Sequence, residues 1–264
     1  MNRIDKLFSE KKKDVLGVYF TAGYPAGISV VKMTADLGQA GVDFIEVGMP
    51  FSDPLADGPV IQESSTVALK NGMTISKLFS ELRLLREKTE VPVVLMGYMN
   101  PVMQFGFEKF LAECAFCGID GVILPDMPVE VYIEEHKKHF EVNSVYPVFL
   151  ISPQTPAARV KFITEQSKGF IYLVSSSATT GTNGELSAEQ QSILKETISQ
   201  VSNLPVMVGF GIHDSKSFKA ATKYASGGIV GSAFIRALGN DPFNAIDNTV
   251  RTIKPELYDH SVSR

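Results

Sequence analysis

Eight short apolar runs recur along the chain, and each is followed by a small or polar turn and then by an amphipathic stretch. The runs are rich in Val, Ile and Phe and are bounded by Gly, Pro and Asp, which is typical of parallel strands buried on both faces. They are Val15–Phe20, Phe44–Val47, Pro92–Met96, Gly121–Leu124, Val145–Ile151, Phe170–Val174, Pro205–Val208 and Gly228–Val230. The pattern predicts a strand–helix repeat along the whole chain.

The stretches between these runs predict helices, at Ser29–Gln39, Ile75–Lys88, Phe107–Phe116, Val129–Phe140, Ala157–Gln166, Ala188–Val201, Ser215–Tyr224 and Pro242–Ile253. Strand–helix alternation fits an open doubly wound sheet or a closed barrel, and eight units in about 250 residues is the usual size of the barrel. No linker divides the chain. We therefore predict an α/β protein, a (β/α)8 TIM barrel formed as a single domain over residues 1–264, with extra loop helices. Ile4, Leu7 and Phe8 lie at helical spacing and predict a short N-terminal helix.

Charge and composition exclude several classes of protein. The formal net charge is −4 and the basic residues are scattered, which argues against a nucleic-acid partner. No apolar stretch reaches the roughly 20 residues that span a bilayer, and residues 1–13 lack the apolar segment of a signal peptide. These features predict a cytoplasmic protein without a membrane partner. Cys114 and Cys117 have no second pair and no nearby histidine, which predicts packing and no metal site.

One strand carries an ionisable side chain in an apolar setting. Period-two alternation in the second run places Phe44, Glu46 and Gly48 on one side of the strand. If that side faces the barrel interior, the Glu46 carboxyl group must find partners or shift its pKa upward, and a raised pKa suits proton exchange near neutrality. A glutamate paired with a lysine, or one that faces the outer helices, is the structural alternative.

The loop after this strand, from Met49 to Pro59, contains prolines at 50, 54 and 59 and aspartates at 53 and 57. Prolines reduce the entropy lost when a loop is ordered, and long loops at this end of a barrel carry sites. Asp57 can reach back over the barrel mouth toward Glu46. An ordinary turn at Asp57-Gly58 is the alternative.

Glycines follow the last two strands, at Gly209, Gly211 and Gly231, and Ser232 comes next. Such glycines let backbone N–H groups approach an anion, and barrels often bind phosphate here with the help of a helix N-terminus. Tight turns are the alternative. No nucleotide-binding pattern is complete. The small polar residues 175–184 predict a loop that either closes over a substrate as a lid or has no special role.

The segment Ile45-Glu46-Val47-Gly48 followed by Pro50-Phe51-Ser52-Asp53-Pro54-Leu55-Ala56-Asp57-Gly58-Pro59 resembles the signature of the tryptophan synthase α chain family. The resemblance extends over nearly the whole chain, through Phe20–Pro25, Tyr98–Pro101, Asp126–Pro128, Tyr172–Ser175, Gly209–Ile212 and Gly231–Ala233. It implies a lyase that cleaves indole-3-glycerol phosphate to indole and glyceraldehyde 3-phosphate. It also implies a β-chain partner in an α2β2 heterotetramer, with pyridoxal phosphate on the β chain and no cofactor on this one.

The resemblance assigns roles to individual residues. Its catalytic residues are Glu46, Asp57 and Tyr172; its phosphate contacts are Gly181, Gly211, Gly231 and Ser232, with Phe210 nearby; Thr180 is a further substrate-binding residue; its indole pocket comprises Tyr19, Met96 and Ile123; its partner contacts are Pro50, Phe51, Asp53, Leu55 and Asn100. Ala178 stands where the family usually has glycine, and Ser176 where some members have arginine.

Two other functions fit parts of this pattern. One is another phosphate-binding barrel lyase or isomerase, although the absence of lysine from the eight apolar runs counts against a Schiff-base aldolase. The other is a non-catalytic subunit that only activates a β partner, and the presence of both Glu46 and Asp57 argues against it. An assay of indole release by the isolated chain separates these hypotheses.

Overall fold

The computed structural model describes residues 1–174 and 187–259, and in those residues nine parallel strands form a single sheet with the order β5-β4-β3-β2-β1-β9-β8-β7-β6. The strands are β1 (Val15–Thr21), β2 (Phe44–Gly48), β3 (Val93–Met96), β4 (Gly121–Ile123), β5 (Tyr146–Pro147), β6 (Leu150–Ile151), β7 (Ile171–Leu173), β8 (Val206–Val208) and β9 (Gly227–Val230). All of the predicted runs lie on these strands.

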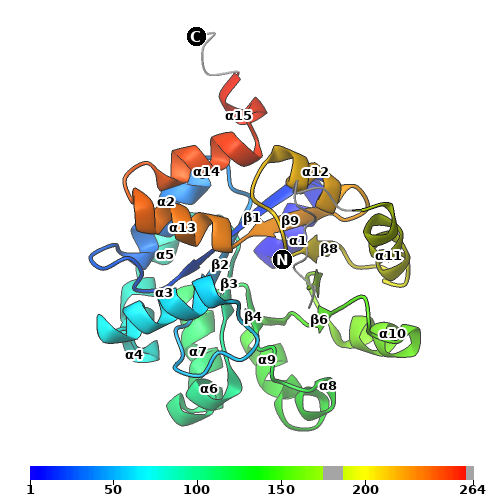
Figure 1. Ribbon diagram of the computed structural model, residues 1–264. Coiled ribbons are helices and arrows are strands. Elements are labelled where there is room, and N and C mark those ends of the chain that lie inside the picture. Colours follow the sequence, from blue (N-terminus) through cyan, green and yellow to red (C-terminus); the bar gives the residue numbers. More distant parts are fainter. Residues whose placement is uncertain (175–186, 260–264) are drawn as a thin grey trace.

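The two edges of the sheet, β5 and β6, are consecutive pieces of one predicted strand, Val145–Ile151. The two residues between them also bond to both neighbours: Val148 N–H donates to Val122 at 3.0 Å, and Tyr172 N–H donates to Phe149 at 3.0 Å. The sheet therefore curls round and meets itself, with helices on its outside (Figure 1). This architecture confirms the predicted TIM barrel.

Helices surround the strands in the order in which the chain alternates. They are α1 (Arg3–Glu10), α2 (Val30–Gln39), α3 (Pro59–Lys70), α4 (Ile75–Leu82), α5 (Leu85–Lys88), α6 (Met99–Phe105), α7 (Phe107–Cys117), α8 (Val129–Val131), the π-helical turn η1 (Tyr132–His136), α9 (Lys137–Asn143), α10 (Ala157–Gln166), α11 (Ala188–Ser199), α12 (Ser215–Thr222), α13 (Ser232–Asn240), α14 (Ala245–Ile253) and α15 (Glu256–Asp259). The predicted helix over Ile75–Lys88 is two helices, and α3, α6 and α13 are extra loop helices.

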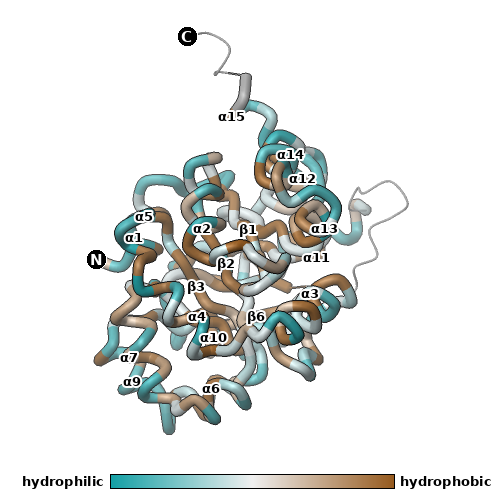
Figure 2. The backbone as a smooth tube through the Cα atoms, turned by 90° about the vertical axis from the view of Figure 1, so that its left-hand side faces the viewer, coloured by the Kyte–Doolittle hydropathy of each residue, from teal (hydrophilic) through white to brown (hydrophobic). Residues whose placement is uncertain are grey.

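The barrel interior is apolar except at one end. Phe44 of β2 contacts Phe170, just before β7, with ring centroids 5.3 Å apart. Because β2 and β7 are not neighbours in the sheet, this contact crosses the interior, so Phe44 points inward. Figure 2 shows the hydrophobic strands in the middle of the molecule and more hydrophilic segments outside. Burial of this apolar surface is the main driving force for the fold.

The short N-terminal helix α1 closes the end of the barrel where the strands begin. Ile4 is fully buried, and its side chain lies close to Gly121 and Gly169, which precede or begin two strands. Phe8 packs on Phe170, with centroids 6.2 Å apart. Since α1 covers this end, the opposite end, where the strands finish, is the one left for loops and chemistry.

Within residues 1–174 and 187–259, every helix is too short or too polar to traverse a bilayer. The cytoplasmic location stays a prediction, as does the single-domain organisation of residues 1–264.

Candidate active site

Glu46 lies inside the barrel, in the middle of β2. Its Cα is in register with Tyr19 on β1 and with Val94 on β3, and its side chain is fully buried. It shares a face of β2 with Phe44, which contacts the opposite wall of the barrel. The alternation in the sequence therefore oriented Glu46 correctly, and the alternative in which it faces the outer helices is wrong.

Burial gives the Glu46 carboxyl group an unusual proton affinity. Burial, and to a smaller extent the charge of Asp57, raise its pKa from 4.5 to about 8, while the neighbouring Tyr172 hydroxyl lowers it. Among the described residues, neither carboxylate oxygen has a hydrogen-bond partner of standard geometry. A buried carboxyl group without a cationic partner holds its proton near neutral pH, so Glu46 can both give and take a proton.

Asp57 supplies the second carboxyl group, from the loop between β2 and α3. Burial raises its pKa to about 6, and a hydrogen bond from the Tyr98 hydroxyl, 3.1 Å to Oδ2, lowers it. Gln62 on α3 donates to the Asp57 backbone oxygen at 2.9 Å, and the Ala56 N–H donates to the Tyr98 oxygen at 3.1 Å. The loop is therefore held from both sides, and Asp57 is not a plain surface turn.

Two tyrosines complete the walls around these carboxyl groups. Tyr19 on β1 and Tyr172 on β7 are both buried, and each lies against a glycine of a nearby strand end. A Cβ atom at Gly48 would lie 2.1 Å from the Tyr19 oxygen, and one at Gly209 would lie 1.9 Å from Tyr172 Cε2. The two glycines make room for the two rings.

The remaining predicted pocket residues end neighbouring strands. Met96 ends β3 and Ile123 ends β4, and the two residues are paired in register. Ile123 is fully buried and Met96 is half-buried. These side chains provide apolar surface near Glu46, as an aromatic ring would require.

The predicted phosphate site lies after β8 and β9. Gly211 has a φ of 68°, a conformation that favours glycine, and Gly231 caps the N-terminus of α13, which begins at Ser232. A Cβ atom at Gly231 would lie 3.8 Å from Ile61 Cδ1 and 3.8 Å from Tyr19 Cβ, which is ordinary van der Waals contact, so the glycine lies next to the Tyr19 side of the pocket. Phe210 is half-buried beside Gly211. Thr180 and Gly181, like Ser176 and Ala178, lie outside the described residues.

The predicted partner residues sit on the rim of the same end. Leu55 is 93% exposed, Asp53 and Asn100 are exposed, and Pro50 and Phe51 are half-buried. The Phe51 ring packs on Tyr98 at a centroid distance of 5.4 Å. The loop that follows β2 therefore contacts Tyr98, and Tyr98 in turn donates a hydrogen bond to Asp57.

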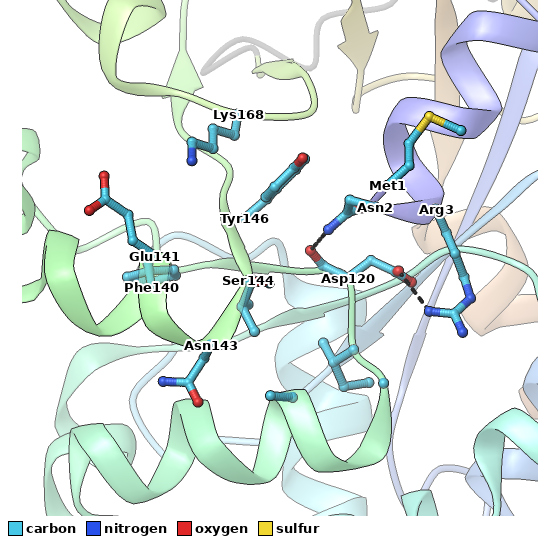
Figure 3. A pocket seen from close by; sticks show the side chains of 14 residues that line it. Met1, Asn2, Arg3, Asp120, Phe140, Glu141, Asn143, Ser144, Tyr146 and Lys168 are labelled. Carbon is cyan, nitrogen blue, oxygen red and sulfur yellow. Dashed lines mark hydrogen bonds and ion pairs between the residues drawn. The ribbon is translucent and has the colours of Figure 1, made fainter.

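A separate pocket of about 490 Å³ lies at the other end of the barrel, near α1 (Figure 3). There Asp120, just before β4, accepts from Arg3 at 3.3 Å and from Arg86 at 2.7 Å, and its backbone oxygen accepts from Asn2. The Asn2 and Arg3 contacts fasten α1 to the barrel, Arg86 adds a contact from α5, and the catalytic residues of such barrels lie at the opposite end. We regard this end as structural.

The part of the chain described here contains no group of three or more His, Cys, Asp and Glu side chains placed to hold a metal ion. Cys114 and Cys117 are buried in α7, as the packing interpretation predicted.

Two participants in the site, Tyr98 and Gln62, were not assigned a role from the sequence, and Gly209 was predicted to approach an anion and not to contact Tyr172. Tyr98 and Gln62 hold Asp57, and Gly209 accommodates Tyr172. Tyr98 follows the end of β3, at the edge of the sheet where barrel sites are built, and that position was the available signal. No sequence signal marks the contact between Gly209 and Tyr172.

A closed β/α barrel with two carboxyl groups of raised pKa, one inside the barrel on β2 and one in the loop that follows it, has the features of the barrel enzymes that work by acid–base chemistry. Comparison with known proteins is more specific. A family model described as "Tryptophan synthase alpha chain" matches residues 6–259. The chain belongs to the tryptophan synthase alpha chain family, and the resemblance seen in the sequence is confirmed.

Relatives and solved structures agree with this assignment. The chain is 47% identical over 254 residues to the tryptophan synthase alpha chain of Christiangramia forsetii, covering 96% of this chain and 99% of the relative. It is 48% identical over 258 residues to that of Flavobacterium johnsoniae, covering 96% and 100%. The crystal structure of the alpha chain from Legionella pneumophila subsp. pneumophila superposes with a TM-score of 0.86, at 32% identity and full coverage of both chains. The family places the chain in tryptophan biosynthesis.

Proposed function

We propose that this chain cleaves indole-3-glycerol phosphate to indole and glyceraldehyde 3-phosphate, as the α subunit of a tryptophan synthase. The observation that carries the proposal is the buried Glu46, with a pKa of about 8, beside Asp57, with a pKa of about 6. At neutral pH this pair holds one protonated and one ionised carboxyl group, which is the combination that an acid–base cleavage needs.

The reaction breaks the bond between indole C3 and the first carbon of the glycerol chain. Glu46 delivers its proton to C3, which gives an indolenine with positive charge on the ring nitrogen. The Asp57 carboxylate accepts a hydrogen bond from the ring N–H and stabilises that charge. Glu46 then takes the proton of the glycerol hydroxyl as the carbon–carbon bond breaks. The bonding electrons return to the ring, the hydroxyl carbon becomes the aldehyde, and Glu46 regains its proton.

The substrate's phosphate belongs at the other side of the mouth. Gly211 and Gly231 permit close approach of backbone N–H groups, and the partial positive charge at the start of α13 favours an anion in front of Ser232. Phe210, Thr180 and Gly181 complete the proposed phosphate site. Tyr19, Met96 and Ile123 form the proposed indole pocket.

We further propose that the chain acts with a β chain, in an α2β2 heterotetramer whose pyridoxal phosphate lies on the β chain. The support is the rim surface of Pro50, Phe51, Asp53, Leu55 and Asn100, defined here as the partner rim. Its Leu55 exposes an apolar side chain to solvent, and its Phe51 contacts Tyr98, which binds Asp57. Docking at this rim can therefore influence a catalytic carboxyl group.

An indole-release assay with the isolated chain tests the proposal. We expect slow but measurable release of indole from indole-3-glycerol phosphate. Glu46→Gln keeps the size of the side chain but cannot transfer protons, so turnover should fall at least about a hundredfold. Thr66→Ala, on the exposed side of α3, is the matched control and should keep normal turnover.

The result also distinguishes the proposed lyase from the two alternative functions, a non-catalytic subunit and another barrel lyase or isomerase. A chain that releases no indole, alone or with a β chain, would be a non-catalytic subunit or a different lyase. The described strands contain no lysine, so a Schiff-base mechanism has no nucleophile on them. Near-normal turnover by Glu46→Gln would overturn the mechanism.

A further inference from the structure

A row of hydroxyl groups runs from the active-site pocket into helix α3. The Tyr19 oxygen lies 3.3 Å from Thr21 Oγ1, and Thr21 Oγ1 lies 2.6 Å from Ser64 Oγ. The Ser64 hydroxyl donates to the backbone oxygen of Ile61 at 2.8 Å. All three side chains are buried, so bulk water does not compete for these bonds. We call Tyr19, Thr21 and Ser64 the hydroxyl relay.

The relay has a fixed direction, because each hydroxyl carries a single hydrogen and a carbonyl oxygen can only accept. The Ser64 hydroxyl donates its hydrogen to the backbone oxygen of Ile61, so the Thr21 hydroxyl must donate to Ser64. The hydrogen of Thr21 is then used as well, so Tyr19 must donate to Thr21. Only the lone pairs of the Tyr19 oxygen therefore remain to interact with groups in the active-site pocket.

The Tyr19 hydroxyl lies where these lone pairs matter. Tyr19 is paired in register with Glu46, and its oxygen sits over Gly48, the residue two positions further along the same face of β2. Burial, and then the negative charges of Asp57 and Glu46, raise the pKa of Tyr19. The phenol is therefore neutral and within the electrostatic reach of both catalytic carboxyl groups.

We propose that Thr21 and Ser64 are positioning residues for the reaction, which hold the Tyr19 hydroxyl with its hydrogen turned away from Glu46 and its oxygen facing the carboxyl groups as an acceptor. A hydroxyl that donated to the Glu46 carboxylate would stabilise the charged form and weaken the acid. The hydroxyl relay keeps the hydrogen of Tyr19 on Thr21, so Tyr19 does not donate to Glu46. A hydroxyl dipole whose oxygen end faces the carboxyl groups disfavours the charged form of Glu46, and so favours the protonated form that delivers a proton to indole C3. The inference rests on the role proposed above for Glu46.

The test is the ionisation of Glu46 itself, followed by carboxyl ¹³C NMR on the full chain labelled in glutamate. Glu46→Gln identifies the Glu46 resonance by its loss. In Ser64→Ala the relay ends at Thr21, which is then free to donate to Tyr19, and the hydrogen of Tyr19 can turn to Glu46. We expect the Glu46 titration midpoint to fall by at least about half a pH unit. Thr66→Ala removes a hydroxyl from the same helix outside the relay, and should leave the midpoint unchanged.

A second background shows whether the effect passes through Tyr19. In Tyr19→Phe there is no hydroxyl to turn, so adding Ser64→Ala should not move the Glu46 midpoint further. Thr21→Val, which keeps the shape of the side chain, should repeat the effect of Ser64→Ala. An unchanged midpoint in Ser64→Ala, or the same shift with and without the Tyr19 hydroxyl, would overturn the inference. Because the titration needs no substrate, its outcome is independent of whether the chain cleaves indole-3-glycerol phosphate.

Discussion

The ring of Tyr172 lies directly over the Cα of Gly209, so closely that a Cβ atom at position 209 would be 1.9 Å from Tyr172 Cε2 and 2.3 Å from its oxygen. The backbone on each side is fixed by the sheet: Gly209 N–H donates to Leu173 at 3.0 Å, and Tyr172 N–H donates to Phe149 at 3.0 Å. Since the backbone cannot retreat, any side chain at position 209 must displace the tyrosine. Gly209 is thus part of the candidate active site through the space it leaves.

The first prediction follows from this contact. Gly209→Ala should push the Tyr172 ring away from its place beside Glu46 and lower turnover at least about tenfold, since small displacements in an active site have large effects on rate. Steady-state indole release checks it, with thermal unfolding to confirm that the variant folds. Wild-type turnover in a folded Gly209→Ala chain would show that the position of Tyr172 is unimportant.

The second prediction concerns stability and pH. Folding raises the pKa of Glu46 from 4.5 to about 8, so the folded state binds this proton more tightly than the unfolded state. The resulting stabilisation is fully present below pH 4.5 and is lost as the pH rises through 8. Glu46→Gln cannot ionise and should lack this loss. The variant should therefore gain stability relative to wild type between pH 5 and pH 8.

Chemical unfolding of both chains at several pH values measures the difference. The free energy of unfolding of the two should diverge with rising pH in the stated direction. Parallel curves across this range would mean that Glu46 has an ordinary pKa in the folded chain.

The third prediction concerns Asp57. The Tyr98 hydroxyl donates to Asp57 and lowers its pKa, which stands at about 6. Tyr98→Phe removes this donor, so the pKa of Asp57 should rise above 6 and less of the carboxylate should be ionised near neutrality. Turnover should fall more at pH 6 than at pH 8. A uniform loss at all pH values in the kcat/KM profile would assign Tyr98 to packing alone.

The sequence predicted the parts of this site that depend on local periodicity. The alternation around Glu46 oriented its side chain because the strand is regular, and the glycines after β8 and β9 lie at the strand ends that the pattern implied. The contacts of Tyr98 with Asp57 and of Gly209 with Tyr172 join segments from different strands. Such contacts depend on the register and curvature of the closed barrel, which no local pattern contains.

Two predicted elements differ from the structure, one for a local reason and one for a long-range reason. Helix α3 was not predicted as a separate helix, because its buried face carries the small residues Ser64, Ser65 and Ala68 and has little apolar periodicity. The run Val145–Ile151 was predicted as one strand, yet its two halves pair with different neighbours, β5 with β4 and β6 with β7. Closure of the sheet at that point is a property of the whole barrel.

The fourth prediction tests the phosphate site. A Cβ atom at position 231 would make only ordinary contacts, 3.8 Å to Ile61 and to Tyr19, so Gly231→Val should fold, but the valine side chain crowds the N-terminus of α13. Binding of glycerol phosphate and of substrate should both weaken, and isothermal calorimetry measures the first directly. Equal affinity in wild type and variant would place the phosphate elsewhere.

The last prediction concerns the partner rim. Leu55 is 93% exposed on the loop that carries Asp57, so its side chain is free to bury itself in an interface. We expect a tryptophan synthase β chain to raise the turnover of this chain, and Leu55→Asp to abolish that rise, because a charged group buried without a partner opposes docking. The basal rate of the isolated variant should stay near wild type, since the Leu55 side chain lies almost wholly in solvent. Val142→Asp is the matched control: Val142 is 75% exposed on α9, near the opposite end of the barrel, and its replacement should leave the response intact. A wild-type chain that is fully active alone, or a Leu55→Asp chain that responds normally, would show that this rim does not bind the β chain.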